Sequence, residues 1–202
     1  MGQKKKGICS KWIESSITEE NKEGLVVSPN KIIFSFNSGT LPKISNNENL
    51  IMIATGTGIA PFRNFLLDRF YRSKSESFIG SVTLFFGCRN KELDFLYGDE
   101  YEMFKNCPQM KFDYHVAFSR DQNEKIYVQD LIKKNCDYVY EMIFIKKCYV
   151  FLVGNSKVLP KSLDNALKYV YNINKGEEIS EEEWNKILHS LKKSGKFYIE
   201  TW

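Results

Sequence analysis

Histidine is scarce in this chain, because only His115 and His189 occur in 202 residues. With so few imidazoles, we expect neither a histidine-based catalytic triad nor a histidine metal site, and we assign no metal-binding residues. The five cysteines are odd in number and show no C-x-x-C spacing. This pattern argues against a disulfide framework and a zinc site, and it favours a reducing, cytoplasmic setting.

Other absences narrow the class of protein further. No apolar run approaches the roughly 18 residues of a membrane span, and no signal-peptide pattern opens the chain. The net charge of +4 is mild and spread along the sequence, which argues against a nucleic-acid surface. By contrast, a hydrophobic share of 43% supports a substantial core. The length fits one large domain, or one domain with a fragment of another.

From Leu50 onward, strand and helix patterns alternate. The expected strands are Leu50–Ala54, Val82–Gly87, Phe112–Phe118, Tyr149–Val153 and Phe197–Thr201. Alternation at these lengths predicts an α/β fold with a doubly wound, mainly parallel five-stranded sheet. Ligands of such sheets bind at the carboxyl ends of the strands.

Five helices are expected between these strands. The first covers Pro61–Arg72, the second begins near Glu92, and the third covers Val128 to about Ile145. The fourth has Leu159, Leu163, Leu167, Val170 and Tyr171 on one face. The fifth opens with a possible capping box of Ser180 and Glu183, followed by an apolar stripe that begins at Trp184.

The first 45 residues do not follow this rhythm. They suggest a short helix around Ser10–Ile17 and a strand around Lys31–Phe36, and residues 46–49 form a polar hinge. We therefore expect residues 1–45 to be the end of one domain and residues 46–202 to be a second domain.

A glycine turn follows the first expected strand and leads into a helix. Gly56 and Gly58 allow the backbone to approach phosphate oxygens closely, and the helix start presents unpaired N–H groups to an anion. Pro61 suits the first helical position, where its missing N–H costs nothing. The turn predicts a pocket for a dinucleotide pyrophosphate, although such turns also occur in proteins that bind no nucleotide.

The end of the next strand indicates which dinucleotide fits. NAD sites usually have a carboxylate here, but this strand ends in Gly87-Cys88-Arg89-Asn90. Farther along, Ser119, Arg120, Lys125 and Tyr127 offer two cations and two hydroxyls that can surround a phosphate. Taken alone, this segment and the turn at Gly154-Asn155 also fit ordinary strand-to-helix loops.

Taken together, these segments resemble the NADP-binding domain of the ferredoxin–NADP reductase superfamily, in particular its diflavin reductases. The matching segments are GICSKW (7–12), ATGTGIAPFR (54–63), FFGCRNKELDFLYGDE (85–100), AFSRDQNEKIYVQDLI (117–132), FLVGNSKVLPKSLDNAL (151–167) and IETW (199–202). They occur in the family's order and cover nearly the whole chain. The fold expected from the resemblance is that family's NADP-binding domain, preceded by a remnant of the FAD-binding β-barrel domain.

The resemblance also implies a role for each matching residue. The NADPH-binding set is Thr55, Gly56, Thr57, Gly58, Ala60, Pro61, Arg89, Ser119, Arg120, Lys125, Tyr127, Gln129, Gly154 and Asn155. In this set, the turn from Thr55 would hold the pyrophosphate, and the Ser119 to Tyr127 group would select NADPH over NADH. Trp202 would stack on the flavin, and Glu200 would lie near the path of the hydride; these two are the catalytic candidates. Gly7, Ile8, Cys9 and Ser10, with Trp202, would contact FAD.

The flavin domain's Arg-x-Tyr-Ser motif and any FMN domain are missing, so we expect a monomeric C-terminal fragment of a larger enzyme. That enzyme would pass hydride from NADPH to FAD, and electrons through FMN to an acceptor protein. Val153 and Glu200 favour the NADPH-dependent diflavin oxidoreductase branch, whose acceptor is an anamorsin-type iron–sulfur protein in cytosolic cluster assembly. The alternatives are an NADPH–cytochrome P450 reductase of the endoplasmic reticulum membrane and a non-catalytic NADP(H)-binding module.

Overall fold

A computed structural model describes residues 7–9, 11–12, 17–21, 24–27, 41–75, 80–156 and 159–201. The chain divides into two compact units, residues 1–39 and residues 40–202. The boundary predicted at residue 45 stays a prediction, as does the flavin-domain origin of the first unit. Among the described residues, no helix is long and apolar enough to cross a membrane.

The described part of the first unit contains helical residues 8–9 and 11–12 and two antiparallel strands, β1 (Ile17–Asn21) and β2 (Gly24–Val27). The short helix expected around Ser10–Ile17 is wrong at its end, because Ile17 already belongs to β1. This pairing was not predicted, since the polar sequence of β1 lacks an apolar alternation. The strand expected at Lys31–Phe36 lies outside the described residues.

The second unit is built on a five-stranded parallel sheet. Its strands are β3 (Leu50–Thr55), β4 (Val82–Cys88), β5 (Phe112–Phe118), β6 (Tyr149–Gly154) and β7 (Phe197–Thr201), in the spatial order β5-β4-β3-β6-β7. Every neighbouring pair is parallel. The predicted doubly wound α/β fold is confirmed, and each expected strand matches an observed one within one residue.

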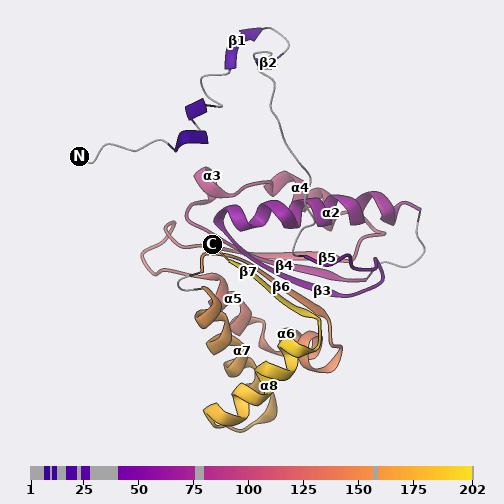
Figure 1. Cartoon of the computed structure of the whole chain (residues 1–202), viewed down its shortest axis with the longest axis vertical. Coiled ribbons are helices and arrows are strands. Elements are labelled where there is room, and N and C mark those ends of the chain that lie inside the picture. The colour runs from indigo at the N-terminus through magenta and orange to yellow at the C-terminus, as the bar shows by residue number, and fades with distance from the viewer. Residues whose placement is uncertain are drawn as a thin grey trace. The chain divides into compact units, whose positions relative to one another are not determined.

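Helices cover both faces of this sheet (Figure 1). On one face lie α2 (Ile59–Ser73), α3 (Lys91–Asp94) and α4 (Gly98–Lys105). On the other lie α5 (Val128–Lys134), α6 (Cys136–Tyr140), α7 (Leu159–Lys175) and α8 (Glu181–Lys193). A short 3-10 turn, η1 (Gly56–Gly58), joins β3 to α2, and a π-helical turn, η2 (Glu141–Ile145), follows α6.

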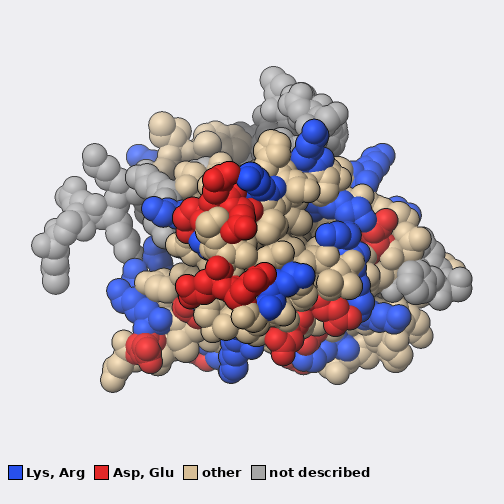
Figure 2. Space-filling model, turned by 90° about the horizontal axis from the view of Figure 1, so that it is seen from below, with Lys and Arg blue, Asp and Glu red and all other residues tan. Residues whose placement is uncertain are grey.

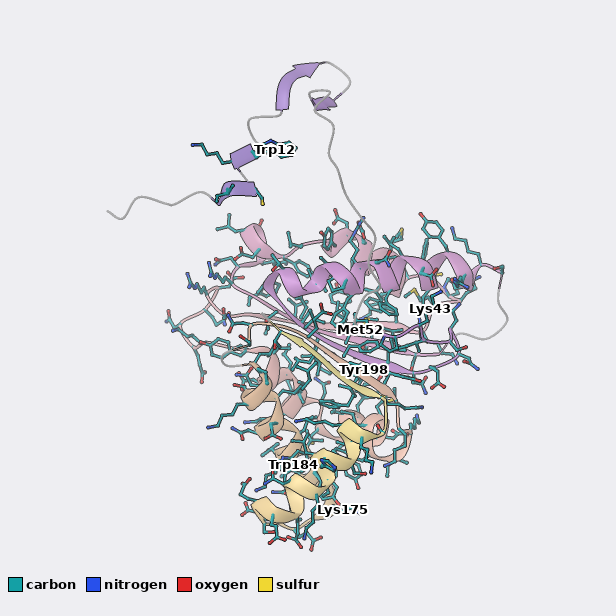
Figure 3. All side chains as sticks on the ribbon, viewed as in Figure 1. Trp12, Lys43, Met52, Lys175, Trp184 and Tyr198 are labelled. Atoms are coloured by element: carbon teal, nitrogen blue, oxygen red, sulfur yellow. The ribbon has the colours of Figure 1, made fainter. Side chains whose placement is uncertain are left out.

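Two apolar cores lie between the sheet and these helices. Strand β3 is buried on both faces, so its alternate residues contribute to different cores: Ile51 and Ile53 to one, Met52 and Ala54 to the other. Figure 3 shows Met52 within the sheet and Trp184 among the helices of the opposite layer. Trp184 is fully buried, and its indole N–H donates to Asp164 Oδ1 over 2.7 Å.

Two helix boundaries differ from the sequence prediction. Helix α2 begins at Ile59, so Pro61 occupies its third position rather than its first. The cost is still small, because N–H groups throughout the first turn of a helix lack intrahelical acceptors. The single helix expected from Val128 to about Ile145 is divided into α5, α6 and η2.

The capping box predicted for α8 is confirmed. Ser180 Oγ accepts from the Glu183 N–H over 3.2 Å, and the Ser180 N–H donates to Glu183 Oε2 over 3.0 Å. Three glutamates stand in the first turn and two lysines in the last, which suits the helix dipole.

In Figure 2 the face seen from below carries carboxylates near its centre, with lysine and arginine side chains around them.

The capping carboxylate should make the stability of α8 depend on pH. Hydrogen bonds from the side chain and backbone of Ser180 hold the pKa of Glu183 below its ordinary 4.5. The stabilisation is therefore present above pH 4.5 and is lost as the pH falls through the lower, folded-state pKa. We expect the unfolding midpoints of the native chain and Glu183→Gln to differ at pH 7 and to converge as the pH falls below the folded-state pKa, as measured by thermal denaturation. A difference that stays constant with pH would contradict this.

Candidate nucleotide-binding site

The carboxyl edge of the sheet brings most of the predicted residues together. In register, Thr55 lies beside Gly87, which lies beside Ala117, while Ala54 pairs with Val153 and Val153 with Glu200. Strand order reverses between β3 and β6, so this edge contains the topological switch point at which α/β sheets bind ligands.

The glycine turn is fitted closely against the end of β6. A Cβ on Gly58 would lie 2.4 Å from the carbonyl oxygen of Val153, and a Cβ on Gly154 would lie 2.3 Å from Thr55 Oγ1. Gly56 has a φ of +54°, yet a Cβ there would meet nothing within 4 Å. At Gly58 and Gly154, therefore, glycine is needed because the turn packs too closely for a side chain. At Gly56 glycine is favoured by the positive φ, and the space around it is open.

The loops after β4 and β5 are joined through their backbones. The Ser119 N–H donates to the Cys88 carbonyl over 2.9 Å, and the Arg120 N–H donates to the Arg89 carbonyl over 2.8 Å. The Ser119 hydroxyl also donates to the Cys88 carbonyl over 3.2 Å. Arg89 and Arg120 are both exposed, and they follow the carboxyl ends of the adjacent strands β4 and β5 at the same level of the sheet. Two cations beside the glycine turn suit a ligand with more than one phosphate group.

Asp121 braces this pair of loops, a role that the sequence did not reveal. It accepts from the Asn90 side chain over 2.7 Å and from the Lys91 N–H over 2.8 Å. Burial, together with the carboxylates of Asp94 and Asp121, raises the pKa of the Cys88 thiol to about 12. Cys88 therefore remains a neutral thiol at physiological pH and contributes no negative charge to the site.

The start of α5 closes the other side of this region. A Cβ on Gly87 would lie 3.5 Å from Val128 Cβ and 3.4 Å from Thr55 Cγ2, so α5 begins next to the ends of β3 and β4. Tyr127 precedes α5, and its N–H donates to Asp130 Oδ2 over 2.8 Å. Lys125 and Tyr127 are exposed, and Gln129 is half-buried. The structure thus holds the predicted Ser119 to Gln129 group within one loop and helix start.

A further cluster joins α2 to the start of α4. Arg63 donates to both carboxylate oxygens of Glu100, and the shortest hydrogen bonds run from Nε to Oε2 at 2.8 Å and from Nη2 to Oε1 at 2.7 Å. Its guanidinium lies 4.8 Å from the ring centre of Tyr97. The hydrogen bond to Glu100 also raises the pKa of Arg63. Tyr97 has a φ of 65°. Arg63 lies in the matching segment 54–63, and Tyr97 and Glu100 lie in the segment 85–100. Because the two segments are far apart in sequence, only the resemblance could have indicated the cluster.

The remaining predicted residues lie elsewhere. Ala60 and Pro61 are in the first turn of α2, and Thr57 and Asn155 are exposed in and next to the glycine turn. Glu200 is exposed on β7, two strands from β3. Gly7, Ile8 and Cys9 belong to the first unit, whose position relative to the sheet is not determined. Ser10 and Trp202 lie outside the described residues.

Comparison with known proteins supports the interpretation of the carboxyl edge of the sheet as a nucleotide-binding site. The family model of the oxidoreductase NAD-binding domain matches residues 52–161, which is more than half of the chain. The chain is 34% identical over 98% of its length to NADPH-dependent diflavin oxidoreductase 1 of Schizosaccharomyces pombe, and equally to that of Danio rerio. It is 31% identical over 76% of its length to the NADPH–cytochrome P450 reductase of Musca domestica, of which it covers 22%.

The chain spans about a third of the length of the diflavin oxidoreductases that it matches, since it covers 31% of the S. pombe and Danio proteins. The match to the family model nevertheless includes the glycine turn, both cationic loops and the end of β6. The resemblance predicted from the sequence motifs is confirmed. The chain belongs to the family of oxidoreductase NAD-binding domains and, within it, is similar to the NADPH-dependent diflavin reductases.

Proposed function

We propose that this chain is the NADPH-binding part of a flavoprotein reductase, in which hydride passes from NADPH to FAD and electrons continue through FMN to an acceptor protein. One observation carries this proposal. The glycine turn lies at the switch point of the sheet, and the Arg120–Arg89 backbone hydrogen bond holds two cationic residues at the ends of the neighbouring strands. A glycine cradle with a second cationic position suits a dinucleotide that carries an additional phosphate.

The residues of the chain would act mainly by binding and orientation. The N-terminus of the 15-residue helix α2 offers backbone N–H groups to the pyrophosphate, beside the open space at Gly56. Ser119, Arg120, Lys125 and Tyr127 would hold the 2′-phosphate through charge-assisted hydrogen bonds. NADPH supplies the hydride when bound, so the chain needs no acid–base pair for this chemistry. Glu200, at the carboxyl edge on β7, would lie towards the reacting end of the nucleotide.

The end of β4 supports a preference for NADPH over NADH. NAD sites place a carboxylate there to bind the ribose hydroxyls, but this strand ends at Cys88 and is followed by Arg89. The nearby carboxylate of Asp121 is occupied by Asn90 and Lys91. A 2′-phosphate would therefore meet cations and donors at this position rather than a free carboxylate.

For the acceptor, we propose an anamorsin-type iron–sulfur protein, reduced in the cytoplasm. Val153 and Glu200, together with the Gly154-Asn155-Ser156 turn, favour this branch. The 31% identity with the Musca domestica cytochrome P450 reductase supports the second candidate, a reductase of P450 enzymes. NADPH-dependent reduction by the full-length protein, assayed in parallel on an iron–sulfur acceptor and on a P450, separates the two.

Arg120→Ala is the sharpest test of NADPH selection. Removing one charge-assisted contact to a phosphate should weaken NADPH binding by about 10- to 100-fold. Affinity for NADH, which lacks that phosphate, should change less than about twofold. Calorimetric titration of both nucleotides measures the difference. Arg72→Ala is the matched control, because it removes an arginine that pairs with Asp68 near the other end of α2. Equal losses for both nucleotides would overturn the 2′-phosphate assignment.

A further inference from the structure

A cavity lies at the amino ends of the strands, opposite the edge that carries the candidate nucleotide site. Its volume is about 530 Å³, and its floor includes Cys148 just before β6, Val150 near the start of β6 and Phe197 at the start of β7. The nucleotide site is at the carboxyl ends of the same strands. Because β6 has six residues, the two sites are separated by roughly 20 Å of strand. This volume falls within the range of small-molecule binding sites.

Apolar side chains form the body of this cavity. Three of the lining residues, Ile143, Cys148 and Val150, are at most 4% exposed. Burial raises the pKa of the Cys148 thiol to about 12, so it adds no charge to the floor. The walls come from η2, α7 and α8, and they include Phe144, Tyr171, Ile187 and Leu191. Phe144 and Tyr171 meet edge to face with their ring centres 5.2 Å apart. An apolar or aromatic group would displace water from these surfaces favourably.

The charge of the lining has one sign. Lys147, Lys175 and Lys196 contribute to it, and none of the described lining residues is Asp or Glu. Lys196 is partly engaged, with Nζ 3.4 Å from Glu48 Oε2 and 4.8 Å from the ring centre of Tyr149. Glu141, in the π-helical turn η2, forms an ion pair with Lys146, whose Nζ lies 2.9 Å from Glu141 Oε1. Lys147 and Lys175 are exposed, and neither has an ion pair with a described carboxylate.

The backbone around η2 brings a lysine to the rim of this cavity. In the π turn, the Lys146 N–H donates to the Glu141 carbonyl over 2.8 Å, and the Cys148 N–H donates to the Met142 carbonyl over 3.0 Å. Lys147, between these two donors, has a φ of 54°. The wide turn and this left-handed residue return the chain to β6. The cationic Lys147 therefore sits directly beside the apolar floor at Cys148.

We propose that this cavity binds a small amphipathic anion, with an apolar or aromatic body in the pocket and a single carboxylate or sulfonate at Lys147 and Lys175. The apolar floor excludes a highly charged ligand such as a nucleotide, because its phosphates and hydroxyls would lack partners there. The lysines at the rim exclude a cation. Figure 3 shows Lys175 in the helical layer that also contains Trp184, on the side of the sheet opposite α2.

The matched dyes anilinonaphthalene sulfonate and phenylnaphthylamine test this proposal, since they differ in the sulfonate alone. We expect the whole chain to bind the sulfonate dye saturably at one site. The double variant Lys147→Gln/Lys175→Gln should weaken that binding about 5- to 10-fold, while the neutral dye binds with unchanged affinity. Lys186→Gln/Lys193→Gln, which removes two lysines of α8 that do not line the cavity, should leave both affinities unchanged. Fluorescence titration measures the affinity of each of the three proteins for each dye.

A variant that fills the cavity shows whether the dye binds inside it. Ser190 is exposed and lines the cavity, whereas its neighbour His189 is exposed and does not. Ser190→Trp should abolish binding of both dyes, and His189→Trp should not. NADPH titration and the unfolding midpoint should be unchanged in every variant, which separates this site from the proposed nucleotide site. Three results would each overturn the proposal: no binding of the sulfonate dye, binding that persists in Ser190→Trp, or an affinity for that dye that is unchanged in Lys147→Gln/Lys175→Gln.

Discussion

Replacing Gly58 with alanine should weaken NADPH binding by about a hundredfold, or ~3 kcal/mol, because the added methyl group has no space. Its Cβ would lie 2.4 Å from the carbonyl oxygen of Val153 and 2.8 Å from the carbonyl carbon. Both atoms are backbone of β6, which is held between β3 and β7, so the glycine turn would have to move instead. Displacing the turn removes the phosphate cradle from the switch point. Calorimetric titration with NADPH measures this loss.

The same substitution should lower the free energy of unfolding by about 1–3 kcal/mol, the usual cost of overpacking. Gly176→Ala is the control, because Gly176 follows α7, has a φ of +73°, and a Cβ there would meet nothing within 4 Å. It should cost about 1–2 kcal/mol of stability from left-handed strain and leave nucleotide affinity intact. If Gly58→Ala bound NADPH as tightly as Gly176→Ala, the close fit of the turn against β6 would be wrong.

Replacing Arg69 with methionine should lower the free energy of unfolding by about 3 kcal/mol or more. This α2 side chain is only 2% exposed. Its guanidinium donates to three backbone carbonyls: Nη1 to Gly80 over 3.1 Å, and Nη2 to Ser45 over 3.2 Å and to Glu48 over 2.8 Å. Methionine fills similar space but donates no hydrogen bond, so these carbonyls lose a charged donor. Urea denaturation measures the change.

The control for Arg69 is one turn away on the same helix. Arg72 pairs with Asp68 at the surface, where both side chains are more than half exposed. Arg72→Met should therefore cost less than about 1 kcal/mol. Arg69→Lys should recover part of the stability, because a lysine can donate to some of the three carbonyls. Similar costs for the methionine variants of Arg69 and Arg72 would show that the buried hydrogen bonds contribute little.

Much of the fold was predictable because the strands of a parallel sheet are buried on both faces and read as continuous apolar runs. Leu50–Ala54 and Tyr149–Val153 are such runs, and each was predicted to within one residue of the observed strand, β3 or β6. The division of α5 from α6 was not predictable from periodicity. At Asn135 the φ and ψ are −103° and 36°, and its side-chain amide donates to the Leu131 carbonyl over 2.8 Å. Such a local hydrogen bond competes with the helix.

The candidate site was predictable as a set of loops, since parallel strands bring their carboxyl ends to one edge. What the sequence could not show are contacts between residues far apart in the chain. Arg63 meets Glu100 across 37 positions, and Asp121 meets Asn90 across 31. Arg69 would be expected on an exposed face from its residue type, yet distant carbonyls explain its burial. These are tertiary contacts, and no local pattern encodes them.

The place of β3 in the sheet also constrains how this chain acquires its structure during synthesis. Leu50 pairs with Val82 on one side, but on the other side it pairs with Tyr149, almost a hundred residues later. At roughly 5–20 residues per second, a ribosome needs about 5 to 20 seconds to supply the second partner. Until then, an apolar strand edge destined for the centre of the sheet remains open. The nascent chain therefore needs protection from aggregation during this interval, before the phosphate cradle can exist at all.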